Sequence, residues 1–281
     1  MPARLVAKHL SRQLNVPVHV ENRDGASGMI GTEFVANAAP DGYTIQYTVA
    51  DSHSINPHLF PAIRYDAIRD FHPIAVIGFS PCTLVVHPKV GAQSFAQFLA
   101  IAKAKPGEIT FATWGVGSGG HVRMAALASA TGVEFNHVPF KGSAPALQSV
   151  VSGQVDAMIV PAGMARPQGA AGKIKLLAVD TSERFELVPE VPTYGEQGLS
   201  IDLKFWQGVL APKGTPPDIL QTLNRAINNA LADPEALAEL SRLGLVRASV
   251  GDNGLQATTA YMHAEYTRWG TVIKAAHISV R

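Results

Sequence analysis

The sequence has little cysteine and little charge, and each shortage excludes a class of protein. Its single cysteine, Cys82, has no second cysteine to pair with, so an internal disulfide is excluded. Cysteine usage therefore does not indicate whether the protein resides in an oxidising or a reducing compartment. Charged residues make up 16% of the 281 residues, and 23 basic against 22 acidic residues give a formal net charge of +1. A nucleic-acid groove or a surface for anionic membranes needs a basic stripe, and none is visible. No nucleic-acid partner is therefore expected.

Long apolar runs are also missing. No run approaches the roughly 20 residues that a membrane-spanning helix needs. The opening MPARLVAKHL lacks the charged region, apolar region and cleavage site of a signal peptide. The sequence as written is expected to be a soluble protein, and 47% hydrophobic residues in a chain of 281 can bury a sizeable core in one or two domains.

Motifs for catalysis and metal binding are absent too. The ten histidines include no H-E-x-x-H, and neither the His53/His58 nor the His121/His137 separation gives a recognisable zinc set. Ser118 lies three residues before His121, but no G-x-S-x-G turn surrounds it and no orienting acid follows at a usual spacing. The residues therefore indicate no catalytic group and no metal site.

Strand and helix patterns alternate along the chain. Apolar residues at helical spacing predict helices over residues 3–14, 28–42, 94–108, 119–132, 143–154 and 258–276. Short apolar runs predict strands over residues 16–22, 43–49, 109–113, 133–140, 155–160 and 174–181. Residues 203–231 are typical of a strand followed by a helix with one apolar face, formed by Ile219, Leu220, Leu223, Ile227 and Leu231. This alternation favours parallel sheets covered by helices, in two lobes.

The end of the chain contributes too little strand for a lobe of its own. We expect it to return to the first lobe, so that lobe 1 comprises residues 1–106 plus 207–281 and an inserted lobe 2 comprises residues 107–206. A ligand cleft is expected between the lobes. Trp206 and Trp269 are expected in the core, and Asp156 is expected to cap backbone amides near the hinge rather than touch ligand.

The stretch FATWGVGSGGHVRM leads from a strand into a helix and places Gly115, Gly117 and Gly120 in a G-x-G-x-x-G pattern. A dinucleotide site requires an acidic residue about 20 positions further on. The following strand instead ends in NHVPFKG, with Lys141 at that place, which disfavours a dinucleotide. Backbone N–H groups that converge at a helix N-terminus still suit another anion, and Lys141 favours a second negative group.

The chain contains, in this order, the segments VHVENRDGASGMIGTEFVANAAPDGYTI, HSINPHLF, RYDAIRDFHPIAVI, LVVHPKVGAQSFAQFLAIAKAKPGEITFAT, HVPFKGSAPALQSVVSGQVDAMI and FWQGVLAPKGTPPDILQTLN. Together they resemble the extracytoplasmic solute receptors of tripartite tricarboxylate transporters, the TctC or Bug-type binding proteins. The resemblance implies an α/β, type II periplasmic-binding-protein fold whose two lobes close on a small carboxylate. It also implies a periplasmic monomer that delivers its ligand to membrane permease subunits, without catalysis and without a cofactor.

The resemblance places the family's ligand loops at three points of this sequence. The first lobe contributes Ala50, Asp51 and Ser52. The glycine turn contributes Thr113, Trp114, Gly115, Gly117, Ser118 and His121, and the PFKG stretch contributes Phe140, Lys141 and Gly142. Structural roles for the same residues stay open: the glycines for positive φ, His121 for helix packing, and Lys141 as a solvated loop charge.

Three departures from the family pattern bear on these expectations. Family members usually begin with a signal peptide and a strand that ends in a proline- and glycine-rich loop, whereas this sequence starts at the helix after that loop. The first sheet is then expected to lack a strand and to leave backbone groups unpaired. Trp114 stands where a small residue is usual, and either stacks on a flat ligand or fills space. Asp51 stands where small or hydroxylic residues are usual, and a carboxylate there favours an amine.

The identity of the ligand is left open by these residues. A monocarboxylate, a dicarboxylate, an aromatic carboxylate or an amino acid would each fit. The alternative to a transport receptor is a repurposed intracellular enzyme or sensor on the same fold that acts on a small carboxylate.

Overall fold

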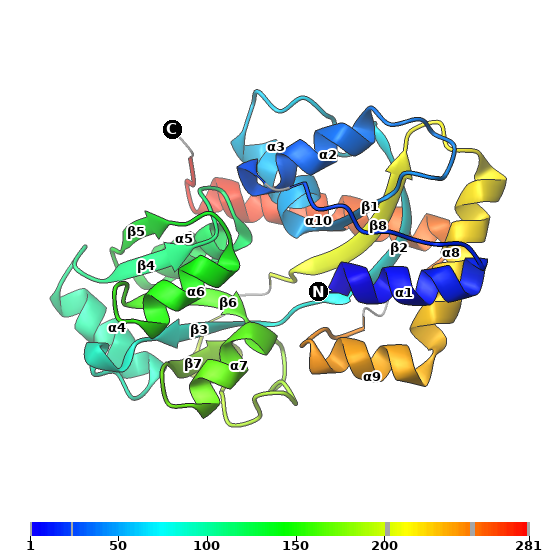
Figure 1. The fold of residues 1–281 in the computed structure, drawn as a ribbon. Coiled ribbons are helices and arrows are strands. Elements are labelled where there is room, and N and C mark those ends of the chain that lie inside the picture. The colour runs from blue at the N-terminus through cyan, green and yellow to red at the C-terminus, as the bar shows by residue number, and fades with distance from the viewer. Residues whose placement is uncertain (1, 24, 200–202, 248–250, 280–281) are drawn as a thin grey trace. The chain divides into compact units, whose positions relative to one another are not determined.

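The computed structural model of the chain describes residues 2–23, 25–199, 203–247 and 251–279. It divides into two compact units, of which unit 1 comprises Met1–Phe79 and Trp206–Thr271, and unit 2 comprises Ser80–Phe205 and Val272–Arg281. Each unit has its own sheet (Figure 1). Within the described ranges, no helix combines the length and the hydropathy needed to cross a membrane.

Unit 1 is built on an antiparallel sheet in the order β1-β8-β2. Its strands are β1 (Gln46–Val49), β2 (Phe71–Phe79) and β8 (Trp206–Pro212). Its helices are α1 (Pro2–Leu14), α2 (Met29–Ala36), α3 (Asn56–Leu59), α8 (Pro217–Ala232), α9 (Pro234–Arg242) and most of α10 (Leu255–Ala275).

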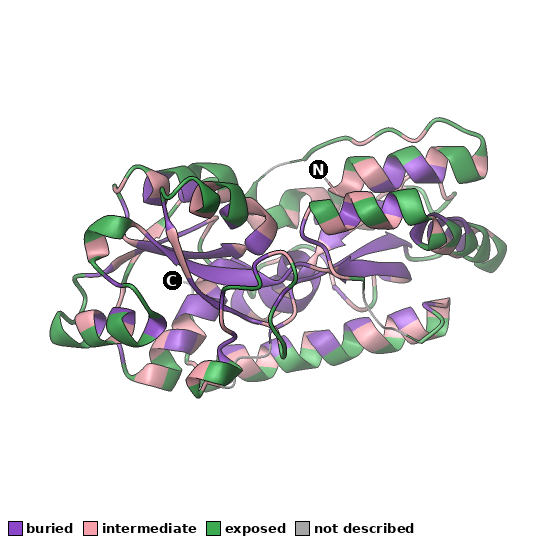
Figure 2. Ribbon diagram, turned by 90° about the horizontal axis from the view of Figure 1, so that it is seen from below, coloured by how far each residue is buried: buried purple, intermediate pink, exposed green. Residues whose placement is uncertain are grey.

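The core of unit 1 lies between this sheet and the helices α1 and α8. The predicted apolar face of α8 is confirmed: Leu220, Leu223, Ile227 and Leu231 are buried in this core, and Ile219 packs at its margin. Figure 2 shows the same pattern, with the strands buried and the helices alternating between buried and exposed residues. Burial of one face per helix is what stabilises these helices in water.

Strand β2 carries two register shifts, which leave backbone groups without a ladder partner. β2 is also an edge strand, and on its outer edge Asn253 Oδ1 accepts from Val76 N at 3.0 Å while Asn253 Nδ2 donates to Val76 O at 3.0 Å. Asn224 on α8 donates to Ile74 O at 2.6 Å. These amide side chains hold α8 and the start of α10 against the irregular strand.

Unit 2 contains a mixed sheet in the order β5-β4-β6-β3-β7. Strand β4 pairs in parallel with β5 and β6, and β3 pairs antiparallel with β6 and β7. The strands are β3 (Cys82–Val86), β4 (Thr110–Thr113), β5 (Asn136–Pro139), β6 (Ala157–Pro161) and β7 (Lys175–Val179). The helices are α4 (Phe95–Ala104), α5 (Gly119–Thr131), α6 (Ser143–Val151) and α7 (Ala162–Ala170).

Two expectations about the strands are wrong. The prediction of parallel sheets fails for all of unit 1 and for β3, because β8 returns from unit 2 antiparallel to both of its neighbours and β3 runs against β6 and β7. Residues 16–22 form no strand, and Val16 is half exposed. A period-2 apolar pattern makes a strand only where a neighbouring chain supplies ladder hydrogen bonds.

The division into units falls elsewhere than at the predicted residue 106. The chain leaves unit 1 between Phe79 and Ser80, since β3 pairs with β6 and β7 and therefore belongs to the sheet of unit 2. It returns at Trp206, and the last part of α10, from Val272 onward, is again in unit 2.

The core positions predicted for Trp206 and Trp269 and the capping role predicted for Asp156 are confirmed, while the predicted place of Asp156 near the hinge and away from ligand stays a prediction. Trp206 and Trp269 are both 0% exposed, and Trp206 donates from Nε1 to Ser54 Oγ at 3.0 Å. Asp156 caps a backbone amide, because its Oδ2 accepts from Thr110 N at 2.9 Å and from Thr110 Oγ1 at 2.6 Å. Its other oxygen lies 3.0 Å from Lys89 Nζ.

Replacing Asp156 with Ala is expected to lower the free energy of unfolding by about 1–3 kcal/mol, because the Thr110 N–H then loses its acceptor in a part-buried place. Chemical denaturation followed by circular dichroism measures this loss. Glu134→Ala, at an exposed position of the same unit, is the control and should change stability by less than about 0.5 kcal/mol. Equal effects of the two substitutions would contradict a capping role.

Candidate functional site

The predicted glycine turn lies between β4 and α5 in unit 2, and we call residues 113–121 the β4–α5 turn. Gly115 has φ 142° and Gly117 has φ 77°, values that side chains with a Cβ rarely adopt. Ser118 N donates to Gly115 O at 3.2 Å, which closes the turn. Ser118 is the N-cap of α5, and its Oγ accepts from His121 N at 3.5 Å. The turn therefore places the N-terminal amides of α5 next to the carboxyl end of β4.

The third glycine of the pattern has a packing role. A Cβ built on Gly120 would lie 2.7 Å from the Trp114 ring, so the indole occupies the place a larger residue would need. The same indole makes an edge contact with Phe205, with ring centroids 5.8 Å apart. Of the two roles considered for Trp114, filling space is the one that these contacts describe.

His121 is fixed to the turn by its ring. Gly117 N donates to His121 Nδ1 at 3.1 Å, and a nitrogen that accepts carries no hydrogen, so the neutral ring carries its proton on Nε2. The His121 ring stacks on His137, with centroids 4.2 Å apart and planes 9° apart, and His137 stacks in turn on Phe111. His137 Nε2 lies 2.7 Å from Thr113 Oγ1, which ties the stack to the end of β4.

Both histidines are neutral at pH 7. Burial lowers the pKa of His121. Burial, followed by the neighbouring His121, lowers the pKa of His137 to about 4. Neither ring therefore adds a fixed positive charge to the turn, and an anion there would be met by backbone N–H groups, hydroxyls and the helix dipole.

The PFKG residues follow the neighbouring strand. Strands β4 and β5 are parallel with Thr113 opposite Pro139, so the turns after them lie at the same edge of the sheet. Phe140 N donates to Thr113 O at 2.9 Å. Gly142 has φ 113° and precedes α6, and Lys141 beside it is exposed. The site residues that the sequence analysis assigned to this unit thus lie on two turns that follow adjacent parallel strands.

The residues assigned to unit 1 form a buried turn directly after β1. Ala50, Asp51 and Ser52 are all buried, and a single π-helical turn runs through Asp51–Ile55. Ser52 Oγ lies 2.6 Å from Thr48 Oγ1, and Ser52 O accepts from Tyr65 Oη at 2.7 Å. Single π-helical turns occur often at functional sites.

His53 in this turn is buried to the same extent as Ser52. Its Nδ1 lies 3.0 Å from Ser52 Oγ, and its ring packs edge-on against Phe71 with centroids 4.7 Å apart. Burial lowers the pKa of His53 to about 3, so this ring is neutral as well.

Unit 1 contains a glycine turn that the sequence analysis did not name as a site candidate. Gly25, Ala26, Ser27 and Gly28 all have positive φ, from 46° to 123°, directly before α2. Positive φ at two consecutive residues that are not glycine is costly and concentrates at functional sites. Ser27 O accepts from Asn56 Nδ2 at 3.0 Å, so the turn is fixed against the segment that follows Asp51–Ile55. The only signal in the sequence was RDGASG, which predicts a turn without indicating these angles.

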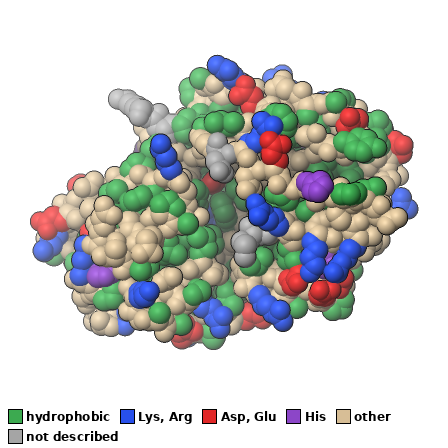
Figure 3. Space-filling model, viewed as in Figure 1, with side chains coloured by type: hydrophobic (Ala, Val, Ile, Leu, Met, Phe, Trp, Pro, Cys, Tyr) green, Lys and Arg blue, Asp and Glu red, His purple; other side chains and the backbone are tan. Residues whose placement is uncertain are grey.

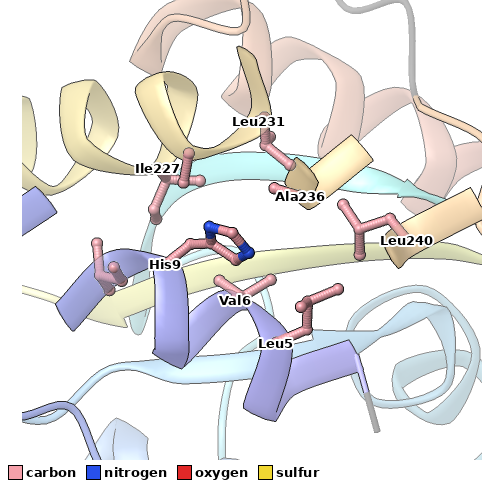
Figure 4. A pocket seen from close by; sticks show the side chains of 9 residues that line it. Leu5, Val6, His9, Ile227, Leu231, Ala236 and Leu240 are labelled. Atoms are coloured by element: carbon pink, nitrogen blue, oxygen red, sulfur yellow. The ribbon is translucent and has the colours of Figure 1, made fainter. Parts of the chain in front are cut away.

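A cavity and a groove in unit 1 are alternative places for a ligand. The cavity lies between α1, α8 and α9, and its volume of about 10 Å³ holds one water at most. Figure 4 shows the His9 ring at its wall, among Val6, Ile227 and Leu240. The groove, of about 500 Å³, is lined by His72, Pro73, Leu220, Leu255, Gln256, Thr259 and Ala260.

The residues that line the cavity and the groove include no Lys or Arg. The cavity is apolar apart from His9, which is buried 3.4 Å from Glu239. Burial, and then the charge of Lys213, lower the pKa of His72 in the groove, so its ring is neutral at pH 7. On the face seen in Figure 3, Lys and Arg side chains are interspersed with Asp and Glu side chains. Among the surface ion pairs, Lys8 and Arg12 both pair with Glu235. In the described part of the chain, no group of three or more His, Cys, Asp or Glu side chains is arranged to hold a metal ion.

Comparison with known proteins gives one consistent result. Residues 2–278 match the sequence model of the tripartite tricarboxylate transporter family receptors. Protein BugT of Bordetella pertussis is 34% identical over 97% of this chain and 83% of its own length.

Two solved structures with bound ligands are also similar. R. palustris Rpa4515 with adipate has a TM-score of 0.94 and 32% identity, over 99% of this chain and 93% of that one. MatC from Rhodopseudomonas palustris with bound malate has a TM-score of 0.90 and 32% identity, over 97% of this chain and 93% of that one.

Substituting Gly120 with Ala is expected to displace Trp114 and to destabilise unit 2 by about 1–3 kcal/mol, the usual cost of forcing extra atoms into a packed place. Combining Gly120→Ala with Trp114→Leu should recover part of that loss, because the smaller side chain leaves room for the new methyl group. Denaturant unfolding of Gly120→Ala, Trp114→Leu and the double variant measures this coupling. Additive losses would show that Gly120 does not serve the packing of Trp114.

Unit 2 is expected to lose stability as the pH falls from about 6.5 to about 4. The pKa of His137 is about 4 in the folded protein, below the ordinary histidine value near 6.5, so in this range the unfolded chain binds a proton that the folded one does not. Replacing His137 with Gln should flatten the decline in unfolding free energy, measured by urea titrations between pH 4 and 7. The lowered pKa of His121 leaves a residual slope of the same sign in unit 2, and the buried His53 adds one in unit 1. Gln148→Ala, at an exposed position of the same unit, introduces no titratable group and is the control, which should leave the slope unchanged.

Proposed function

The chain belongs to the tripartite tricarboxylate transporter receptor family, and we propose that it captures a small organic carboxylate for the membrane permease subunits of such a transporter. The observation that carries the proposal is the β4–α5 turn, where glycines at positive φ, the Ser118 hydroxyl and the N-terminus of α5 meet at one strand end. Fixed N–H dipoles and hydroxyls of this kind solvate a carboxylate without a buried countercharge.

Ligand chemistry follows from the groups around that turn. The ligand-bound relatives named above hold adipate and malate, which are dicarboxylates. One carboxylate would be bound by the β4–α5 turn, with the Nε2 hydrogen of His121 as a further donor. Lys141, on the turn after the adjacent strand, suits a second carboxylate. A dicarboxylate is therefore the first candidate.

Asp51 supports an amino acid as the other candidate. It is buried in the turn after β1, and a carboxylate in that environment favours an ammonium group over a second acid. Ala50, Asp51 and Ser52 stay a prediction as ligand contacts, to be tested by substitution.

The remaining properties of the proposed receptor follow from its family. We infer a periplasmic monomer that binds its ligand reversibly and releases it unchanged. A bound carboxylate recovered intact after prolonged incubation, analysed by mass spectrometry, supports this inference. Accumulation of a product would favour an enzyme on the same fold.

A thermal-shift screen of the purified protein identifies the ligand class. A ligand that binds only the folded state raises the melting temperature, by an amount that increases with its concentration over Kd. The panel consists of monocarboxylates, dicarboxylates including adipate and malate, aromatic carboxylates, and amino acids. We expect shifts from dicarboxylates or amino acids, and no shift from any acid would count against solute capture.

Two substitutions test the position of the site. Ser118→Ala and Lys141→Met should each raise the Kd of the acid found in the screen by about tenfold, because each removes a charge-assisted hydrogen bond worth roughly 1.5 kcal/mol. Isothermal titration calorimetry measures the change.

Matched controls separate binding from folding. Ser94→Ala removes the N-cap of α4, which accepts from Gln97 N at 3.2 Å, and so costs similar stability away from the turn. Lys173→Met removes an exposed lysine of the same unit. Unchanged affinity in both test variants would move the site away from these two turns.

A further inference from the structure

A buried ion pair lies directly behind the β4–α5 turn. Arg123, on the second turn of α5, is 1% exposed, and the side chain of Asp180, after the end of β7, is 2% exposed. Arg123 Nε donates to Asp180 Oδ2 at 2.8 Å. Asp180 Oδ1 accepts from Cys82 N at 2.5 Å. The two charges are thus paired inside unit 2.

Arg123 uses its other donors on backbone carbonyls. Nη1 donates to Gly119 O at 3.3 Å, in the first turn of α5, and Nη2 donates to Leu203 O. Its guanidinium carbon also lies 5.3 Å from the centre of the Phe205 ring. One planar side chain therefore connects α5, the end of β7 and residues 203–205.

These contacts concentrate on the two places where the chain enters and leaves unit 2. Cys82, bonded to Asp180, follows the entry at Ser80 closely, and Leu203 and Phe205 precede the exit to Trp206. Ser80 N donates to Phe205 O at 2.9 Å, so entry and exit are joined to each other. The Phe205 ring contacts Trp114 of the β4–α5 turn, and Trp114 lies over Gly120.

The presence of this buried ion pair is not explained by a contribution to folding stability alone. Desolvation of two charges offsets most of their attraction, and apolar replacements of buried ion pairs are often neutral or stabilising. A planar guanidinium with several fixed donors does hold the groups to which it hydrogen-bonds in fixed positions relative to one another.

We propose that Arg123 and Asp180 are positioning residues for ligand binding. They hold the β4–α5 turn in a fixed position relative to the segments where the chain enters and leaves unit 2. This proposal rests on the proposed function, because it takes the β4–α5 turn to be the place where the ligand binds. The ligand's affinity then depends on two side chains behind the turn, in addition to those that form it.

The test compares affinity and folding in the variant Arg123→Met with Asp180→Asn. Asn keeps an oxygen acceptor for Cys82 N, and the double substitution leaves no unpaired charge. Adipate and malate are the probes, with Kd measured by calorimetry and the melting temperature measured in parallel. We expect Kd to rise at least about tenfold, which is about 1.4 kcal/mol.

Two control variants account for structural effects. Asp156→Ala destabilises unit 2 at a different place and should leave Kd within about twofold of the wild-type value. Substituting Lys105 and Glu108 with Gln removes an exposed ion pair of the same unit, 3.5 Å long, and should change neither quantity. An equal Kd in the wild type and the Arg123/Asp180 variant, or an equal loss in Asp156→Ala, would overturn the proposal.

Amide hydrogen exchange gives a second readout that needs no ligand. The amides of Gly117, Ser118 and His121 are hydrogen-bonded within the turn, and we expect them to exchange at least about tenfold faster in the double variant, while amides of β6 stay unchanged. If the wild type binds neither probe, the dicarboxylate proposal fails, and the exchange result alone decides the positioning role. Unchanged exchange in the turn overturns it.

Arg123→Lys provides a milder variant should the double variant not fold. Lysine keeps the charge but loses the planar set of donors. An intermediate rise in Kd, or intermediate exchange in the turn, supports the proposal. Wild-type values for both would contradict it.

Discussion

The backbone pairing of β8 with both β1 and β2 is the constraint on which the rest of the structure depends. In the described sheet of unit 1, β1 and β2 do not pair with each other, so the strand that returns from unit 2 completes the ladder. The chain therefore leaves unit 1 after Phe79, forms most of unit 2 and returns at Trp206. Ser80, where it enters unit 2, and Phe205, where it leaves, are joined by a hydrogen bond. Arg123 and Phe205 connect that junction to the β4–α5 turn.

The β4–α5 turn offers polarity without net charge. His121 and His137 are neutral because burial lowers their pKa values, and the charge of Arg123 is matched by Asp180. An anion at this place is solvated by dipoles that the backbone has already oriented, so binding it requires little reorganisation. The exposed Lys141, on the turn after the adjacent strand β5, is the candidate for a positive charge beside this turn. A turn of this kind suits reversible capture, because release leaves no unpaired charge behind.

Much of the fold was predictable where local pattern and tertiary packing agree. The apolar face of α8 and the glycine turn before α5 were identified from spacing alone, since burial and positive φ impose those residue types. Residues 16–22 have a strand pattern and no strand, and the antiparallel pairing of β8 left no trace in the local sequence. At the candidate site, sequence placed the β4–α5 turn but missed the positive φ of Ala26 and Ser27, for which neither residue type is a signal.

The sequence by itself determined the family, the α/β alternation and the identity of the turns, because these follow from residue types at fixed spacing. Tertiary structure alone decided which strands pair, that Gly120 makes room for Trp114, and that Arg123 meets Asp180 across 57 positions of the chain. Such long-range contacts depend on how separate segments pack against each other. That information is distributed over the whole chain, and no single motif carries it.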